Sequence, residues 1–205
     1  MMLPQVRSSF LLFAPIFFFY SLIILFVCYY SFVRYSLLPQ TPYLANGGSL
    51  LEQIIYPKLL SDAVIANDRA AVDDRVRRCL ADVNLLRLAE TNADGLLRVH
   101  DEWDDVLSGG ERQRIGFARI FFHAPDLVLL DEATSAINAD EEQTLYARLI
   151  RGESGVAAGA ADAAQGQGQG GATVISIAHR LELKKFHTQT LVIKGDGSGV
   201  WDLTR

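Results

Sequence analysis

Residues 107–132 read LSGGERQRIGFARIFFHAPDLVLLDE, and this stretch decides the fold class. Residues 127–130 form a short continuous apolar run, and the acids Asp131 and Glu132 follow it. This pattern is typical of a buried parallel strand with carboxylates at its carboxyl end. The first half opens with a loop punctuated by two glycines, after which residues 111–123 resume helical periodicity. We therefore expect a helix followed by a buried strand.

A second apolar run, residues 173–177, lies further along the chain and ends just before His179. Residues 139–150 between the two runs have the pattern of a helix. They are followed by residues 152–171, a tract of Gly, Ala and Gln that predicts a flexible insertion with no core of its own. Strand, helix and strand in this order predict a right-handed crossover in a doubly wound α/β core, with functional groups at the carboxyl ends of the strands.

On the N-terminal side, two prolines predict a loop over residues 38–43, and helices are expected at residues 49–56 and 67–89. Before them, residues 8–33 carry no formal charge over 26 positions. Such a run would extend roughly 39 Å as a helix, enough to span a bilayer. We therefore expect residues 1–37 to be a transmembrane leader, or else a product of how the start of the reading frame was assigned.

Composition narrows the class of protein. The 205 residues fit one domain of ordinary size, and a net charge of −5 disfavours a partner bound through bulk electrostatics, so no nucleic acid is expected. The two cysteines, Cys28 and Cys79, form no C-x-x-C motif and no disulfide framework, which agrees weakly with a reducing compartment.

Three groups of residues carry candidate chemistry, and each also has a purely structural explanation. Asp131 and Glu132 could divide the tasks of holding a magnesium ion and activating a water, yet strand-end acids are common. The turn from Ser108 to Glu111 could present backbone N–H groups to a phosphate, yet S-x-x-E is also a capping box. His179 could donate a hydrogen bond to a terminal phosphate, although a lone histidine is more often part of the core or surface.

The order of these groups decides between the explanations. Gln40 in a Pro-bounded loop, LSGGERQ at residues 107–113, the strand ending in Asp131-Glu132, and His179 after it resemble the ATP-binding cassette (ABC) ATPase pattern. The resemblance covers nearly all of residues 38–205. It implies an α/β fold with a parallel sheet core and a helical signature subdomain.

The resemblance also implies ATP and Mg²⁺ as cofactors and assigns roles to single residues. Gln40 would contact the magnesium ion and the transmembrane partner, Asp131 would support the metal, Glu132 would be the general base, and His179 would sense the γ-phosphate. Ser108 and Gly110 would contact the ATP held by an opposite subunit, and Gly109 and Gln113 belong to the same nucleotide-binding set.

The chain departs from the family pattern in its phosphate loop. No G-x-x-x-x-G-K-[ST] motif occurs, and none of the four lysines is followed by Ser or Thr. The leader stands where the family places that loop. We therefore expect residues 38–205 to be an incomplete ABC-type ATPase domain, the C-terminal part of a nucleotide-binding domain, which does not hydrolyse ATP by itself. Asn138 is a second departure, since many cassettes have aspartate there.

Several shorter segments look like the peroxisomal fatty-acyl half-transporters of the D subfamily; they are residues 38–43, 52–57, 186–188, and 195–197 leading to Trp201. That branch implies export of long or very long acyl chains, as CoA esters, from the cytosol into peroxisomes or a glycosome-type organelle. The cassette would face the cytosol at the membrane and pair with a second half-transporter or cassette, as a homodimer or heterodimer.

Two other classes of protein remain open at this point. A soluble ABC ATPase of the DNA-repair or translation type would share the signature and strand motifs, but it would also carry a coiled coil or a tandem cassette. A non-catalytic, membrane-anchored partner subunit would use residues 11–33 as its anchor and the cassette remnant only for binding.

Overall fold

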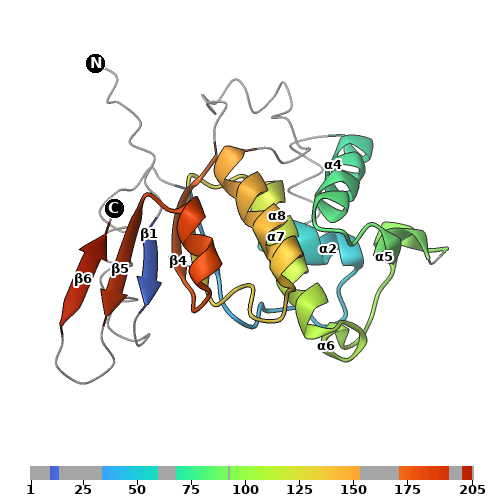
Figure 1. The fold of residues 1–205 in the computed structure, drawn as a ribbon. Helices are drawn as coiled ribbons and strands as arrows, with labels where there is room; N and C mark the ends of the chain where they lie inside the picture. Colours follow the sequence, from blue (N-terminus) through green and yellow to red (C-terminus); the bar gives the residue numbers. More distant parts are fainter. Residues whose placement is uncertain are drawn as a thin grey trace, which may run out of the picture.

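In the described part of the chain, six strands form one sheet at one side of the molecule, and helices lie beside it (Figure 1). The computed structural model describes residues 10–13, 34–59, 68–91, 93–152, 171–193 and 200–204. The strands are β1 (Phe10–Phe13), β2 (Tyr35–Leu38), β3 (Leu127–Asp131), β4 (Thr173–Ile177), β5 (Gln189–Ile193) and β6 (Trp201–Thr204). The helices are α2 (Leu50–Ile55), α4 (Arg69–Asp82), α5 (Arg87–Glu90), α6 (Trp103–Val106), α7 (Gly109–His123) and α8 (Ala139–Arg151), with 3₁₀ turns η1 (Gly95–Leu97) and η2 (Leu181–Phe186).

The order of the strands is β2-β3-β4-β1-β5-β6. The first five pair in parallel, and β6 pairs antiparallel to β5 at the edge. The predicted strands at residues 127–131 and 173–177 are confirmed, and the helix α8 connects them as expected. Asp131 lies opposite Ile177 in this pairing, so the loops after β3 and β4 leave the sheet side by side.

The first part of the leader corrects our expectation of a helix. Residues 10–13 form β1, which pairs with β4 on one side and β5 on the other. A short apolar segment fits a buried strand as well as a helix, so periodicity alone does not separate the two. Tyr35, near the end of the expected leader, begins β2, and Arg34 holds that end of β2 to Asp126 through an ion pair.

Of the run expected to span a bilayer, residues 8–33, all but residues 10–13 lie outside the described residues. The same is true of the flexible insertion predicted at residues 152–171, apart from its two end residues. Among the helices that the structure describes, none has the length and apolar character needed to cross a bilayer.

The helix predicted over residues 67–89 is divided in two. Its first part is α4, and its end forms the short helix α5. The break comes at Asn84, whose φ of 55° is left-handed and incompatible with a continuous right-handed helix. Apolar residues of α4 at three- and four-residue spacing, among them Val72 and Val76, are buried.

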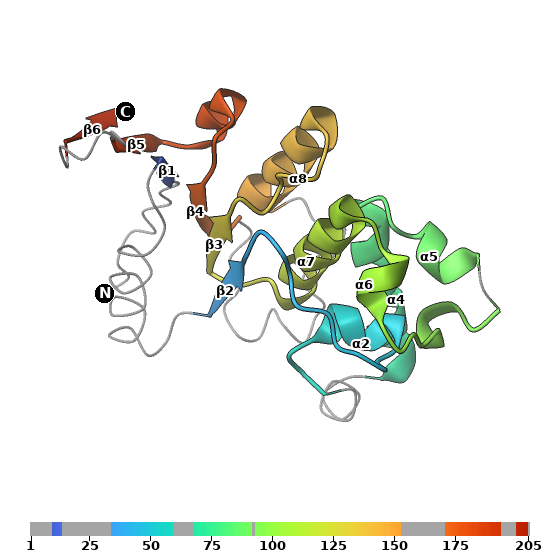
Figure 2. The ribbon, with the colours of Figure 1, turned by 90° about the horizontal axis from the view of Figure 1, so that it is seen from below.

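Seen from below, α2, α4, α5 and α6 form a group to one side of the sheet, and α7 lies between that group and the strands (Figure 2). The expected parallel sheet with a helical subdomain is therefore present. The helix α7 approaches β2 so closely that a Cβ at Gly116 would lie 2.2 Å from a methyl carbon of Leu38. A residue without a side chain is needed there for the helix to pack on the end of the strand.

Candidate functional site

Glu132 and His179 meet at the carboxyl ends of β3 and β4. The Nε2 of His179 lies 2.6 Å from Oε1 of Glu132. The Glu132 side chain is 21% exposed, while that of His179 is 76% exposed and faces solvent. The backbone of Glu132 is left-handed, with a φ of 47°, and its amide donates to the carbonyl of Ile177. A non-glycine residue held in this region is strained by about 1–2 kcal/mol, a cost that often accompanies function.

Asp131 and Gln40 supply the oxygen groups expected to hold a metal ion. Asp131 is the last residue of β3, and Gln40 is exposed in the loop after β2, the strand next to β3. Carboxylate and amide oxygens suit Mg²⁺, which commonly keeps water and phosphate oxygens for the rest of its shell. Within the described part of the chain, His, Cys, Asp and Glu side chains form no cluster of three or more that could hold a metal by themselves. The donors fit Mg²⁺ only together with a ligand.

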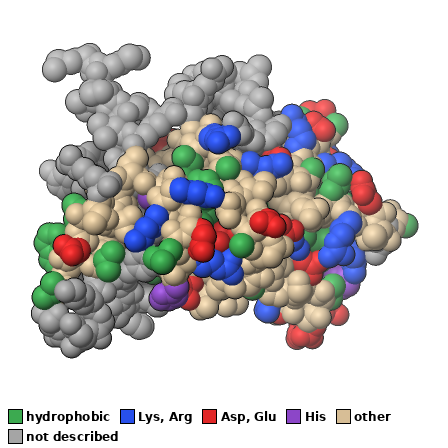
Figure 3. Space-filling view, viewed as in Figure 1, with side chains coloured by type: hydrophobic (Ala, Val, Ile, Leu, Met, Phe, Trp, Pro, Cys, Tyr) green, Lys and Arg blue, Asp and Glu red, His purple; other side chains and the backbone are tan. Residues whose placement is uncertain are grey.

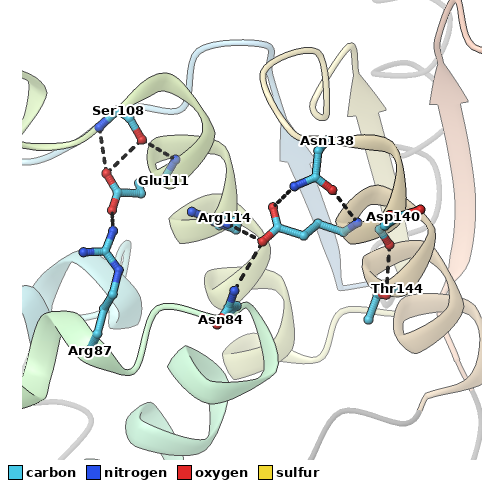
Figure 4. Close-up of polar contacts among 9 residues, drawn as sticks. Asn84, Arg87, Ser108, Glu111, Arg114, Asn138, Asp140 and Thr144 are labelled. Atoms are coloured by element: carbon cyan, nitrogen blue, oxygen red, sulfur yellow. Dashed lines mark hydrogen bonds and ion pairs between the residues drawn. The ribbon is translucent and has the colours of Figure 1, made fainter.

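The signature turn at the start of α7 is a complete capping box. The Ser108 hydroxyl accepts from the amide of Glu111, and the Glu111 carboxylate accepts from the amide of Ser108 at 2.9 Å (Figure 4). Arg87 forms an ion pair with the same carboxylate. The structural explanation of this motif is therefore correct, and it leaves Ser108 itself exposed at the N-terminus of a 15-residue helix.

Gly110 brings this turn against the loop that follows β3. An added Cβ at Gly110 would lie 2.8 Å from the carbonyl oxygen of Ala136, whereas one at Gly109 would lie 3.4 Å from the Ala136 side chain. Only the first distance is a clash, because real Cβ atoms do not approach a carbonyl oxygen so closely. The glycine at position 110 is therefore explained by packing within the chain.

Gln113 corrects our expectation of a nucleotide contact. Its side chain is only 2% exposed. The Nε2 group donates to the Gln40 carbonyl and to the Ser135 hydroxyl, both at 2.9 Å, and Oε1 accepts from the Ala136 amide at 2.9 Å. Both hydrogens of the amide group are donated to other groups of the protein. Gln113 therefore connects three segments of the chain, and its amide does not face a ligand.

Asn138 is the N-cap of α8, and its amide group holds Glu141 by two hydrogen bonds (Figure 4). Glu141 in turn accepts from Arg114 at 2.7 Å and from Asn84 at 3.3 Å. Asparagine caps a helix as well as aspartate does. The departure at position 138 is therefore compatible with the local structure, and it joins α7 and the turn after α4 to α8.

A buried acid that we did not single out from the sequence joins the loops after β3 and β4. Glu142 is 2% exposed and accepts from the Thr134 hydroxyl and from Arg180 at 3.0 Å. Arg180 also donates to the Ile137 carbonyl. The sequence indicates the burial of Glu142, because it has helical spacing with apolar residues three, four and seven positions later, which form the buried face of α8.

Arg119, on α7, connects the loop after Gln40 to α2. Its guanidinium donates to the carbonyls of Tyr43 and Gln53 and lies 5.1 Å from the centre of the Tyr56 ring. Burial lowers the pKa of Arg119 to about 10, so the side chain stays charged at neutral pH. Gln53 is fully buried and exchanges two hydrogen bonds with the backbone of Ala45.

Charged side chains of both signs are mixed over the face of the molecule seen in Figure 3. No basic stripe of the kind that binds nucleic-acid backbones stands out on that face. This distribution agrees with the net charge of −5.

The sequence profile of the ABC transporter family matches residues 32–135, which is half of the chain. That match takes in the Gln40 loop, the signature turn and the strand ending in Asp131 and Glu132. The chain belongs to the ABC transporter family. The most similar relatives found by sequence include several members of its D subfamily, as the resemblance predicted.

Three of these relatives give the scale of the similarity. The chain is 34% identical over 168 residues to ATP-binding cassette sub-family D member 1 of Drosophila melanogaster, covering 82% of this chain and 19% of the fly protein. It is 40% identical over 169 residues to the human lysosomal cobalamin transporter ABCD4, covering 82% and 24%. It is 34% identical over 160 residues to sub-family D member 3 of Mus musculus, covering 78% and 21%.

A bacterial Atm1-family ABC exporter, solved with ATP bound, has a similar fold. The two structures superpose with a TM-score of 0.62 at 22% identity, over 92% of this chain and 32% of the exporter. The chain thus spans about a fifth to a quarter of the length of the three D-subfamily relatives and a third of this exporter.

Proposed function

We propose that this ABC chain provides the signature half of a composite ATP site and that the opposite cassette of a half-transporter pair holds the nucleotide. The observation that carries the proposal is the signature turn. Ser108 is exposed at the start of α7, whose first-turn N–H groups and dipole favour a phosphate. The capping box and the contact of Gly110 with Ala136 hold this turn in place before any ligand arrives.

The other site residues have roles that agree with their positions. If Mg²⁺ and phosphate bind at the chain's own sheet edge, Asp131 and Gln40 would hold the Mg²⁺, which would neutralise phosphate charge. Glu132 would accept a proton from an attacking water, and the exposed imidazole of His179 would orient on the terminal phosphate. In the structure these two side chains are bonded to each other, so a ligand would have to displace that hydrogen bond.

We expect the purified chain alone to show no turnover of Mg-ATP. The 205 residues contain no G-x-x-x-x-G-K-[ST] motif, and β1 is followed by Ala14-Pro15. Without the lysine and the glycine-rich backbone, the β- and γ-phosphates lose their main ligands. The assay compares phosphate release by the chain and by Glu132→Gln. Turnover that Glu132→Gln abolishes would contradict this expectation.

The composite site can be tested by association. The partner is the isolated cassette of mouse sub-family D member 3, with glutamine in place of its own catalytic glutamate so that bound ATP is retained. Light scattering should show a one-to-one complex only when ATP is present. Ser108→Asp should abolish the complex because its charge would repel phosphate, whereas Ser108→Asn, which also caps helices, should retain it.

Equal association by the Ser108→Asp and Ser108→Asn proteins would overturn the composite site. So would a wild-type chain that stays monomeric at every ATP concentration. Melting temperatures of both variants, measured alongside, separate a local charge effect from unfolding, because Ser108→Asp also brings a second carboxylate next to Glu111.

For the cargo, we propose long or very long fatty acyl chains, as CoA esters, carried into peroxisomes by a membrane complex with this cassette on the cytosolic side. The D-subfamily relatives and the segments noted at residues 38–43 and 52–57 support this branch. The competing cargo is cobalamin, which the name of one relative gives. Organelle fractionation of the tagged chain should place it with peroxisomal membranes, and recovery with lysosomes would favour cobalamin.

The two rival classes make different predictions in the same preparation. A soluble ABC ATPase would wash off membranes in alkaline carbonate. A membrane-anchored partner subunit without catalytic function would resist extraction, and it would associate with a full cassette whether or not ATP is present.

A further inference from the structure

The Gln113 side chain connects three segments that are distant in the sequence. Its hydrogen bonds reach the backbone of Gln40, 73 residues away, and the hydroxyl and amide of Ser135 and Ala136, 22 and 23 residues away. All three lengths are 2.9 Å. The side chain comes from the second turn of α7, so the signature helix, the loop after β2 and the loop after β3 share one buried amide.

The Gln113 side chain that makes these hydrogen bonds is buried. With Gln113 only 2% exposed, water cannot readily replace the amide group if it is removed. The Gln40 carbonyl and the Ala136 amide would then lose this partner, and the loss of one hydrogen bond costs about 0.5–1.5 kcal/mol. The loops would shift to find water or other partners.

The same end of α7 touches the loop after β3 at a second point. Gly110, one turn before Gln113, lies so close to the Ala136 carbonyl that no side chain fits between them. A backbone contact and a side-chain bond thus fix the first two turns of α7 on Ala136. Ser108, at the tip of the helix, takes its position from both.

We propose that Gln113 is a positioning residue of the composite ATP site. Its amide holds the signature turn at a fixed distance from the Gln40 loop and the loop after Glu132, so that Ser108 is presented to the opposite nucleotide in a fixed position. This inference rests on the proposed function, because a fixed Ser108 has a purpose only if a nucleotide lies against it. Gln113 itself would not touch the nucleotide.

The first test uses amide hydrogen exchange on the whole chain and needs no ligand. Gln113→Met keeps the size of the side chain and removes all three bonds. Exchange over residues 39–45 and 133–137 should become about fivefold faster or more, since one hydrogen bond contributes about 1 kcal/mol. Gln143→Met, the same change at a half-buried position on α8, is the control and should leave both segments unchanged.

Gln113→Glu makes the test specific. A carboxylate still accepts from the Ala136 amide and from the Ser135 hydroxyl, but it cannot donate to the Gln40 carbonyl. Residues 39–45 should therefore exchange faster while residues 133–137 stay protected. If Gln113→Glu does not fold, Gln113→Met alone decides.

The second test is the ATP-dependent association with the mouse sub-family D member 3 cassette. Half-maximal association of Gln113→Met should need about tenfold more ATP than that of wild type, measured well below the melting temperature of the variant. Gln143→Met should behave as wild type. Unchanged association, or faster exchange spread evenly over β3 and β4, would overturn the positioning role. A wild-type chain that never associates would instead refute the proposed function, and the exchange result would still stand.

Discussion

At the scale of single residues, Gly110 packs directly against the backbone of the loop after β3. Gly110→Ala would place a Cβ 2.8 Å from the Ala136 carbonyl oxygen, and neither backbone can move freely. We expect a loss of about 1–3 kcal/mol in the free energy of unfolding, typical of overpacking. Gly109→Ala, whose Cβ would make an ordinary 3.4 Å contact with the Ala136 side chain, is the matched control and should change stability by less than about 0.5 kcal/mol. Urea unfolding of both variants tests this, and equal losses would show that the contact is unimportant.

At the scale of an element, the capping box of α7 predicts a pH dependence. Burial acts to raise the pKa of Glu111, but the hydrogen bonds from Ser108 and the charges of Arg87 and Arg114 outweigh it, and the pKa is lowered from 4.5. The folded state therefore favours the ionised carboxylate. This contribution to stability is complete above pH 4.5 and is lost as the pH falls through the lowered pKa.

Glu111→Gln should accordingly lower the melting temperature at pH 7, and the difference from wild type should shrink below pH 4.5. The exposed Glu90, at the end of α5, provides the control substitution Glu90→Gln. Thermal unfolding followed by circular dichroism across this range is the measurement. A difference between Glu111→Gln and wild type that stays constant down to acid pH would contradict the role of the charge.

At the scale of the whole molecule, Arg180 and Glu142 join the loops after two neighbouring strands to α8. Arg180→Ala would leave a 2%-exposed carboxylate without its cation and the Ile137 carbonyl without a donor. We expect a loss of about 2 kcal/mol or more in the free energy of unfolding. Arg78→Ala, which removes the exposed i,i+4 pair with Asp74, should cost less than about 0.5 kcal/mol. Similar losses in the two variants would mean that Arg180 acts only as a surface charge.

The strands show which parts of the fold could be predicted from local sequence patterns. The runs at residues 127–130 and 173–177 predict strands because they are continuous, apolar and bounded by polar residues. Residues 35–38 and 189–193 also form parallel strands, yet their own sequences are too short and mixed to reveal it. Their pairing partners lie far away in the chain, and pairing is what makes them strands.

The site divides in the same way. Local spacing made Asp131, Glu132 and the Ser108 turn candidates, since each depends on a strand end or a helix start, and the resemblance in motif order implied their roles. The Glu132–His179 bond follows from two strands lying next to each other, which the order of motifs anticipated. The role of Gln113 could not be predicted, because a glutamine in a signature motif gives no sign of whether it faces a ligand or the interior.

The sequence by itself determined the family and the candidate site residues, because those depend on residue type and on spacing along the chain. Only the tertiary structure decided which polar groups are exposed and which are buried and hydrogen-bonded within the protein. Burial and hydrogen bonding depend on contacts between segments that lie tens of residues apart in the sequence. Ser108 stays exposed and Gln113 does not, although five positions separate them on one helix.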